Sequence, residues 1–272
     1  MKNLIAIFLF MMPVWQGITQ QSLAQQDVTV TYIANEGVFI SAGADQILID
    51  ALHEPYRPAY LPTPPDIKSN IFNAAPPFNS VDILLVSHVH LDHFDAELVG
   101  RYLSYQQGPV LFSSAQVIDS VRAQAGDLTQ VEERIKVVPY KTGESATYAK
   151  GGISVKAGKV THGSARFAWV ENLGHVVKMG GKTFLHVGDP GFGRSDIAQL
   201  LNGEHIDVAL LPAWFVTEKD GRKTINEVIK PDRIIVVHVS PANTATVRKT
   251  TEKHYPEAIV FSEPMESVQI GH

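Results

Sequence analysis

The chain has 272 residues, and 44% of them are hydrophobic, so it can bury a substantial core and intrinsic disorder is excluded. Its formal net charge of −5 disfavours nucleic acid as a partner. It has no cysteine, so any metal site must be built from histidine and carboxylate side chains alone.

Residues 1–24 resemble a cleavable secretory signal. Lys2 precedes an apolar run that ends near Trp15, and the small-residue site Ser22-Leu23-Ala24 follows. The apolar run is shorter than the roughly 20 residues of a membrane-spanning helix, which disfavours the alternative of an uncleaved anchor. The sequence therefore predicts an exported protein, periplasmic or secreted, with a mature domain over residues 25–272. Without Lys2, 22 basic side chains face 28 acidic ones, a net charge of −6.

Short strands are predicted at 28–34, 37–43 and 46–52, separated by turn residues. Residues 54–80 then hold seven of the sixteen prolines, with Tyr56, Tyr60, Phe72 and Phe78 among them. This composition predicts a long irregular loop. Such loops are often lids, so Tyr56, Tyr60 and Phe72 are predicted to wall the active site and to favour a substrate with an apolar portion. The alternative is that this loop mediates a homodimer.

From residue 81 onward, strand and helix patterns alternate. A buried strand at 82–87 is followed by a helix at 95–105, and residues 136–187 are predicted to be mostly strand, including "FAWVEN" at 167–172. Helix and strand alternate again to the end of the chain. This order predicts one α/β domain with two mixed β-sheets and helices outside them.

The stretch "VDILLVSHVHLDHFD" places His88, His90, Asp92 and His93 directly after a strand. Histidines at i and i+2 of an extended segment point to the same side, so His88 and His90 can bind one ion. Asp92 and His93 can turn toward a second position. Imidazole and carboxylate without thiolate suit zinc, iron or manganese. Asp95 either orients a ligand or caps the next helix, and capping is the more common role.

The motif "HVHLDH" resembles the H-x-H-x-D-H signature of the metallo-β-lactamase superfamily. The family's later ligands have counterparts in order: His162 in "KVTHGSA", Asp189 in "FLHVGDPG" and His238 in "IIVVHVS". The resemblance covers residues 28–262 and implies a four-layer αββα sandwich.

By this resemblance, His88, His90 and His162 hold one divalent ion, Asp92, His93 and His238 hold another, and Asp189 bridges the two. Zinc is the expected metal, with iron and manganese as alternatives. Two ions so close would generate a hydroxide from a shared water, which attacks a carbonyl or phosphoryl centre. Asp92 and Asp189 are therefore expected to be catalytic as well as ligating.

Three residues near these motifs have less certain roles. "LHVGD" is similar to "YHAGDT" of the lactonase-like and phospholipase-D-like branches, although Pro190 replaces the threonine. His186 is thus either a donor behind the ligands or a core histidine. Trp214 and Phe215, in "LLPAWFV", either face the cleft or belong to the core.

The leading hypothesis is an exported dinuclear metal-dependent hydrolase of a small ester, lactone or phosphodiester. The first alternative is a mononuclear-iron dioxygenase or a thioester hydrolase of the same fold. A dioxygenase would leave the second metal position empty, whereas the sequence retains its ligands. The second alternative is a non-catalytic metal-binding protein, a class that usually loses ligands.

Overall fold

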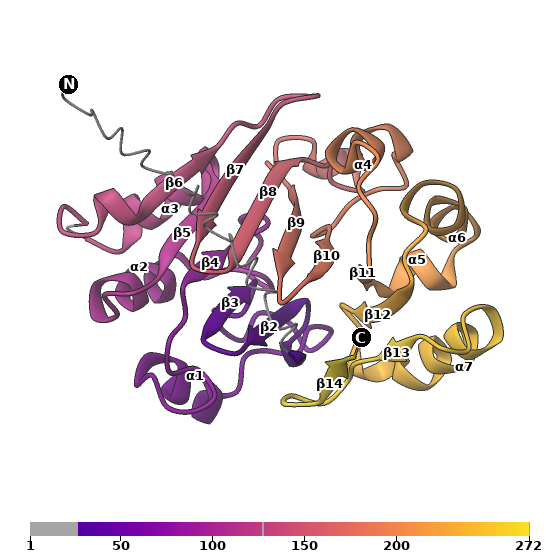
Figure 1. Ribbon diagram of the computed structural model, residues 1–272, viewed down its shortest axis with the longest axis horizontal. Helices are drawn as coiled ribbons and strands as arrows, with labels where there is room; N and C mark the ends of the chain where they lie inside the picture. The colour runs from indigo at the N-terminus through magenta and orange to yellow at the C-terminus, as the bar shows by residue number, and fades with distance from the viewer. Residues whose placement is uncertain (1–26, 127, 272) are drawn as a thin grey trace, which may run out of the picture.

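Two seven-stranded mixed β-sheets face each other in the computed structural model, which describes residues 27–126 and 128–271 (Figure 1). In spatial order, the first sheet contains β14 (Ser267–Ile270), β1 (Val28–Ala34), β2 (Gly37–Ala42), β3 (Asp45–Ile49), β4 (Ile83–Leu85), β5 (Val110–Ser114) and β6 (Ile135–Val138). The second contains β13 (Ile259–Val260), β12 (Arg233–Val237), β11 (Val208–Pro212), β10 (Lys182–His186), β9 (Leu173–Met179), β8 (Ile153–Lys159) and β7 (Ser145–Lys150).

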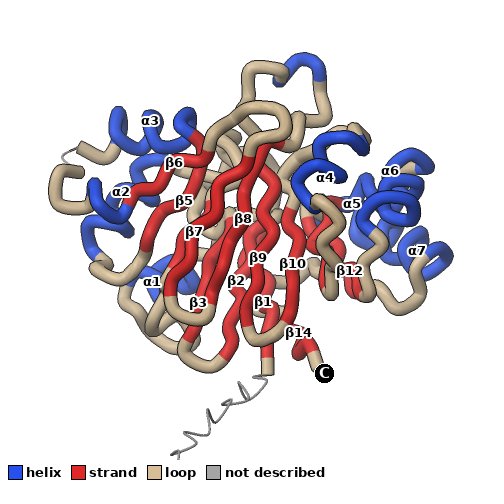
Figure 2. Tube along the Cα trace, turned by 45° about the horizontal axis from the view of Figure 1, so that its top comes forward, coloured by secondary structure: helices blue, strands red, loops and turns tan. Residues whose placement is uncertain are grey.

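The helices cover the two outer faces of this pair of sheets, as Figures 1 and 2 show. On the first sheet lie α1 (Pro65–Phe72), α2 (Ala96–Tyr105) and α3 (Ala115–Gln124), with the short η1 (Glu132–Arg134) leading into β6. On the second lie α4 (Arg194–Leu201), α5 (Ala213–Thr217), α6 (Lys219–Thr224), the π-turn η3 (Ile225–Ile229) and α7 (Thr244–His254), the last preceded by η4 (Pro241–Asn243). The predicted four-layer αββα sandwich is confirmed.

Alternating side chains explain why the layers stack in this order. In β12, Ile235 and Val237 join the apolar cluster between the two sheets, whereas Ile234 and Val236 join the cluster beneath α4 to α7. Successive side chains of a strand point to opposite faces, so an uninterrupted apolar strand can bury both faces at once. The central strands are thus buried on both sides, and polar groups gather where these strands end.

One edge of the sandwich collects the carboxyl ends of the central strands. β3, β4 and β5 are parallel in the first sheet, and β10, β11 and β12 are parallel in the second. The loops that leave these strands therefore emerge together. In sheets of this kind, ligands bind at the carboxyl ends of strands.

The structure corrects two predicted elements. The loop at 54–80 is not irregular throughout, because residues 65–72 form α1, with Pro65 in the first turn and Ile67 and Ile71 buried four residues apart. "FAWVEN" is not a strand: a 3₁₀ turn, η2 (Ala165–Phe167), and a loop precede β9. The predicted signal at 1–24 lies outside the described residues. Within the described part of the chain, no helix is long and apolar enough to cross a membrane.

The β1–β2 hairpin turn is fixed by a close approach to β3. Asn35 and Glu36 form the turn, and Asn35 has a left-handed φ of 48°. A Cβ at Gly37 would lie 2.6 Å from the Asp50 carbonyl oxygen and 2.8 Å from that of Ala34. Both neighbours are backbone atoms, so neither can move aside cheaply, and glycine is required here.

Gly37→Ala should therefore destabilise the fold by about 1–3 kcal/mol, the usual cost of overpacking. Urea unfolding followed by circular dichroism measures this change. Gly271→Ala is the matched control, because nothing lies within 4 Å of the added methyl group. A Gly37→Ala protein as stable as wild type would show that the turn can shift freely.

Candidate metal centre

The seven side chains predicted as ligands meet at the edge where the strands end. His88, His90, Asp92 and His93 follow β4, while His162, Asp189 and His238 follow β8, β10 and β12. His88 and His93 are completely buried, and Asp92, Asp189 and His238 nearly so. The ligands thus come from both sheets.

Four potential ligand atoms border one position, here called the second position. Asp92 Oδ2 lies 3.7 Å from His93 Nε2 and 3.4 Å from His238 Nε2. Asp189 Oδ1 lies 3.2 Å from His93 Nε2 and 3.4 Å from His238 Nε2. Atoms at the corners of a tetrahedron with zinc-ligand bonds of ordinary length are about 3.4 Å apart. The four separations that join a carboxylate oxygen to an imidazole nitrogen are therefore close to the spacing that a bound ion requires.

The other oxygen of Asp189 faces a second set of nitrogens, here called the first position. Oδ2 lies 4.0 Å from His88 Nε2 and 3.8 Å from His162 Nε2. His90 presents Nδ1, 3.0 Å from His88 Nε2. Asp189 thus directs one oxygen to each set, the arrangement of a bridging carboxylate.

Several of these buried atoms have no hydrogen-bond partner within residues 27–126 and 128–271. They are His93 Nε2, His162 Nε2, His238 Nε2 and Asp189 Oδ1. Buried polar atoms are almost always satisfied, so a group of orphaned ones that face one another needs an external partner. Lone pairs of nitrogen and a carboxylate oxygen suit a cation. The donor set fits divalent metal ions.

Asp50 orients His93 from behind. Its Oδ2 lies 2.9 Å from His93 Nδ1, and its carboxylate also accepts hydrogen bonds from the backbone N–H and the hydroxyl of Ser87. This contact places the proton on Nδ1 and leaves Nε2 free for a metal. Burial alone would raise the pKa of Asp50, but the contacts with His93 hold it well below its usual value. No local pattern in the sequence around Asp50 indicates this role.

The β1–β2 turn supports the second position from another side. The Asn35 side chain donates to the backbone oxygen of Asp92 at 2.9 Å and to its Oδ2 at 3.3 Å. The Asn35 carbonyl accepts from the backbone N–H of His238 at 2.8 Å. His238 has a φ of 52°, a conformation that a non-glycine residue adopts only when its surroundings impose it. The turn imposes it here.

His186 and Asp95 have the supporting roles that the sequence left open. His186 is completely buried, and its Nε2 lies 3.3 Å from the Glu36 carbonyl oxygen, so it contacts the hairpin turn. It belongs to none of the three clusters of potential ligand atoms among the described residues. Asp95 caps α2 by accepting a hydrogen bond from the Leu98 N–H at 2.8 Å. The capping interpretation is confirmed.

Predicted pocket residues divide into those near the ligands and those elsewhere. The Tyr60 ring lies 5.6 Å from that of His238 and stacks on Tyr56, and the Trp214 ring lies 5.0 Å from His238. The prediction for Phe72 is wrong: α1 turns its ring onto Tyr102 of α2, 5.5 Å away. Phe215 belongs to α5 and is a completely buried core residue.

Two aromatic residues near the first position were missed. The Phe167 ring lies 4.5 Å from His90 and 5.1 Å from His162, and the Trp169 ring lies 6.4 Å from His90. Trp169 is 62% exposed, unusual for so large an apolar side chain. The signal was present, since both follow His162 closely, but the strand prediction for 167–172 concealed it.

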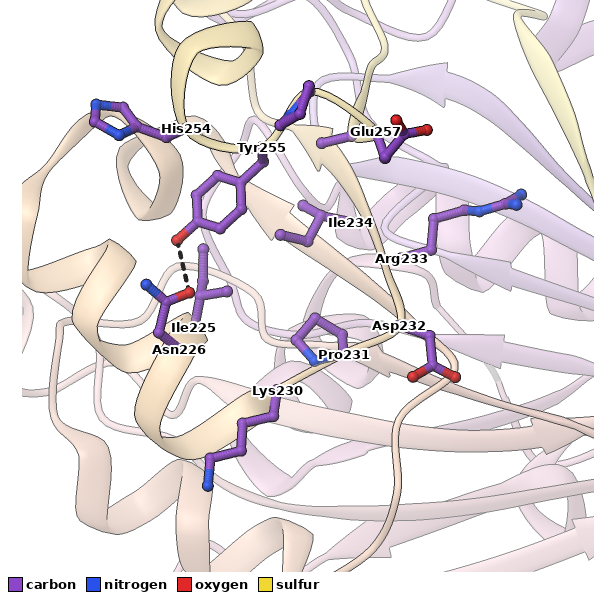
Figure 3. A pocket seen from close by; sticks show the side chains of 12 residues that line it. Ile225, Asn226, Lys230, Pro231, Asp232, Arg233, Ile234, His254, Tyr255 and Glu257 are labelled. Carbon is purple, nitrogen blue, oxygen red and sulfur yellow. Dashed lines mark hydrogen bonds between the residues drawn. The ribbon is translucent and has the colours of Figure 1, made fainter.

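A separate hollow of about 450 Å³ lies between η3, β12 and the end of α7 (Figure 3). Tyr255 crosses it, and its hydroxyl donates to Asn226 Oδ1 at 3.2 Å. The hollow adjoins Arg233 at the amino end of β12, whereas His238 follows the carboxyl end. Five strand residues, or about 16 Å, separate it from the ligands, so it is not part of the metal centre.

Comparison with known proteins identifies the family. The sequence model of the beta-lactamase superfamily domain matches residues 45–255. The chain belongs to the metallo-β-lactamase superfamily.

Two curated relatives and one solved structure extend this match. A metal-dependent hydrolase of Pyrococcus furiosus is 26% identical over 78% of this chain and 84% of its own length. One of Staphylococcus epidermidis is 26% identical over 70% of this chain and 82% of its own. A crystal structure from Veillonella parvula, a possible metal-dependent hydrolase, has a TM-score of 0.63 and 18% identity, and covers 91% of this chain and 100% of that one. The matches support a hydrolase of the metallo-β-lactamase fold.

The protonation of the ligands differs between the two positions. Burial lowers the pKa of His162 to about 4 and that of His88 well below its usual value. At the second position burial acts in the same direction, but the Asp189 carboxylate outweighs it and raises the pKa of His238 to about 9 and that of His93 well above normal. Without metal at pH 7, His93 and His238 are therefore charged.

Metal uptake at the second position should release about two protons from these imidazoliums at pH 7, because only neutral imidazole binds a metal. The affinity should therefore rise with pH up to about 9. The stability of the metal-free fold changes with pH in the opposite direction. Because folding raises the pKa of His238 to about 9, protonation of this side chain stabilises the metal-free fold at low pH, and that stabilisation is lost as the pH rises through about 9. Zn²⁺ titration between about pH 6 and 9, with a pH indicator in weak buffer, measures the proton release and the zinc affinity. An affinity for the second ion that is independent of pH would contradict the assignment.

Proposed function

We propose that the protein is an exported dinuclear metallohydrolase that cleaves a small ester, lactone or phosphodiester with an apolar portion. The observation that carries the proposal is the division of the Asp189 carboxylate between two complete ligand sets, one oxygen to each. A non-catalytic metal-binding protein has no need of two adjoining sets that share one buried carboxylate.

The chain's own residues prepare the site before any substrate binds. Asp189 holds the two positions at a fixed separation, and Asp50 keeps the lone pair of His93 pointed at the second one. Asn35 fixes the carboxylate of Asp92. Two divalent ions held in this way would lower the pKa of a water that they share toward 7 and polarise the bond to be cleaved.

Zinc is the proposed metal at both positions. Each position offers nitrogen and carboxylate oxygen, and the carboxylate-to-imidazole separations at the second, 3.2–3.7 Å, are close to those around a tetrahedral zinc ion. Iron and manganese accept the same ligand types. A mononuclear iron oxygenase would make no use of the second position, whose four atoms are in place.

Aromatic residues on both sides of the ligands support a substrate with an apolar portion. Tyr60 and Trp214 lie beside His238, and Phe167 and Trp169 lie beside His90. Trp214 is held in place because its ring N–H donates to the Pro190 carbonyl oxygen at 3.1 Å. Such walls offer apolar contact and hold few charges. Nucleic acid is not a proposed partner, because the net charge is negative.

Export is proposed from the sequence of residues 1–24. The absence of cysteine is consistent with a fold that is held together by its core rather than by disulfide bonds.

The function is tested by metal analysis and a substrate screen on the purified mature protein. We expect two zinc ions per chain, and turnover of aryl phosphodiesters or lactones in a screen that also contains β-lactams and thioesters. Turnover of thioesters alone would favour the thioester-hydrolase alternative. One iron and no other metal would instead favour the oxygenase alternative, and two ions without hydrolysis of any of them would favour a non-catalytic protein.

Asp189→Asn should leave the fold intact and reduce turnover by about 10²-fold or more, because a neutral amide is a poor bridge between two cations. Circular dichroism, metal content and kcat are measured together. Asp119→Asn, the same change on the exposed side of α3, is the matched control. Near-wild-type turnover with full metal occupancy would show that Asp189 is not the bridge.

Tyr60→Ala and Trp169→Ala should each raise KM for the best substrate by about tenfold, which corresponds to about 1.4 kcal/mol of apolar contact. Metal content should be unchanged. Phe72→Ala is the control, since this aromatic residue packs on Tyr102 instead. If the two variants alter only the oligomeric state, these walls are a homodimer interface and not a substrate site.

A further inference from the structure

Arg57 and Arg166 differ from the other arginines of the chain in their lack of a polar partner. The chain has nine arginines. Seven of them contact an acidic side chain or a backbone carbonyl oxygen: Arg101, Arg122, Arg134, Arg194, Arg222, Arg233 and Arg248. Arg57 and Arg166 are exposed, and within residues 27–126 and 128–271 they have neither an ion pair nor a hydrogen bond. Their N–H donors are therefore available to a ligand.

Arg57 lies at the outer end of the aromatic residues beside the second position. Its guanidinium carbon is 4.7 Å from the centre of the Tyr56 ring. Tyr56 stacks on Tyr60, with 6.1 Å between ring centres, and the Tyr60 ring contacts that of His238. A guanidinium within about 6 Å of a ring centre is attracted to the ring face. The contact holds Arg57 close to the metal ligands and leaves its donors exposed.

Arg166 occupies the corresponding place beside the first position. Its guanidinium carbon is 5.4 Å from the centre of the Phe167 ring, and Phe167 contacts both His90 and His162. Arg166 and Phe167 are neighbours in the 3₁₀ turn η2, which places the cation directly after the ligand His162 in the chain. Each group of aromatic residues that flanks the ligands thus ends in an arginine.

The acidic residues nearest in sequence do not compensate these two cations. Glu54 forms an ion pair with Lys68, and the Glu171 carboxylate accepts a hydrogen bond from the backbone N–H of Gln116 at 3.0 Å. The chain as a whole has a net charge of −5, which repels anions on average. Two uncompensated cations beside the ligands therefore reverse the charge locally, at the place where a substrate must bind.

Exposed apolar side chains surround the same ligands. In the described part of the chain, six large apolar side chains are exposed, and three of them are Tyr56, Leu91 and Trp169. Leu91 stands between the ligands His90 and Asp92 in the chain. Exposed apolar surface of this kind commonly marks a binding site. Apolar surface that ends in arginines fits a ligand with an apolar body and an anionic group.

We propose that Arg57 and Arg166 determine specificity by binding an anionic group that the substrate carries outside the bond to be cleaved, an inference that rests on the hydrolase function proposed above. The substrate class is therefore an anionic amphiphile, with a phosphate or carboxylate group in addition to its apolar portion. Guanidinium groups bind such oxyanions through two parallel N–H donors. A neutral lactone or ester gains nothing from the two arginines.

The test compares two fluorescent probes on the zinc-loaded mature protein. 8-Anilino-1-naphthalenesulfonate is an apolar anion, and N-phenyl-1-naphthylamine has the same rings without the sulfonate. Arg57→Gln and Arg166→Gln should each weaken binding of the anionic probe by about 2–5-fold, the scale of an exposed ion pair, and the double variant by about tenfold. Binding of the neutral probe should be unchanged. Sodium chloride should weaken binding of the anionic probe to wild type, because salt screens exposed charges.

Arg101→Gln is the matched control. Arg101 is also exposed and also lies over an aromatic ring, that of Phe72, but on α2 and away from the ligands. This variant should bind both probes like wild type. Displacement of the anionic probe by hexyl phosphate and by hexanoate then distinguishes the two anions, because the affinity of the recognised group should fall in the double variant.

Three results would overturn the proposal: no binding of the anionic probe to wild type, equal binding to wild type and the double variant, or an equal loss for both probes. The titration requires no turnover, so its failure is distinguishable from that of the proposed function. If the protein hydrolyses its substrates while the double variant binds the anionic probe normally, only the anion site is refuted. If the double variant loses affinity but no substrate is hydrolysed, the anion site is supported and the hydrolase function is contradicted.

Discussion

The structure depends on the burial of one carboxylate, that of Asp189, among histidines from both sheets. A buried carboxylate is tolerated only when charge and hydrogen bonds compensate it, and Asp189 has orphaned nitrogens on both sides. Its backbone is fixed equally firmly. The Asn172 side chain accepts from the Asp189 N–H at 3.0 Å and donates to the Val160 carbonyl at 2.8 Å. A Cβ at Gly188 would lie 2.3 Å from that same amide oxygen, so only glycine fits before Asp189.

Rigid placement explains how the chain can hold ligand atoms at metal-like spacing. β4, β10 and β12, which lead to six of the seven ligands, are buried on both faces at their carboxyl ends, so those ends are fixed by the packing of three apolar clusters. Residues behind the ligands then set their directions: Asp50 for His93, and Asn35 for Asp92. The left-handed backbone of His238 is held by the hydrogen bond from its N–H to Asn35. Such preorganisation reduces the cost of ordering when metal binds.

The proposed substrate walls, in contrast, come mostly from connections between elements, apart from Trp214 in α5. Tyr60 lies in the loop between β3 and α1, and Phe167 and Trp169 lie in the segment between β8 and β9. Loops tolerate substitution far better than packed strands do. Under the proposed function, this division would separate the chemistry, which the sheet ends fix, from substrate choice, which the loops would decide. It also explains why the fold and the family indicate the class of reaction but do not identify the substrate.

Several features of the site could be predicted from sequence because they are local. His88, His90, Asp92 and His93 share one short stretch after a strand, and the order of strand and helix patterns along the chain predicted the two sheets. His162, Asp189 and His238 were found only through the order of ligands in the family. The structure brings all seven together.

Other features depend on tertiary pairing that no local pattern encodes. Asn35 and Glu36 resemble an ordinary hairpin turn, and they reach the ligands only because β1 and β2 pair and Gly37 packs against β3. Asp50 resembles any polar residue that ends a strand. Phe72 was misplaced because the proline-rich composition concealed α1, whose buried isoleucines turn its ring away from the cleft.

The most direct test of the two-metal centre is a crystal structure of the zinc-loaded protein with anomalous scattering measured at the zinc edge. The account predicts two anomalous peaks about 3.5–4 Å apart, with one oxygen of Asp189 on each. Asp92, His93 and His238 should surround the second peak. A single peak held by His88, His90 and His162, with the second position empty at saturating zinc, would contradict it.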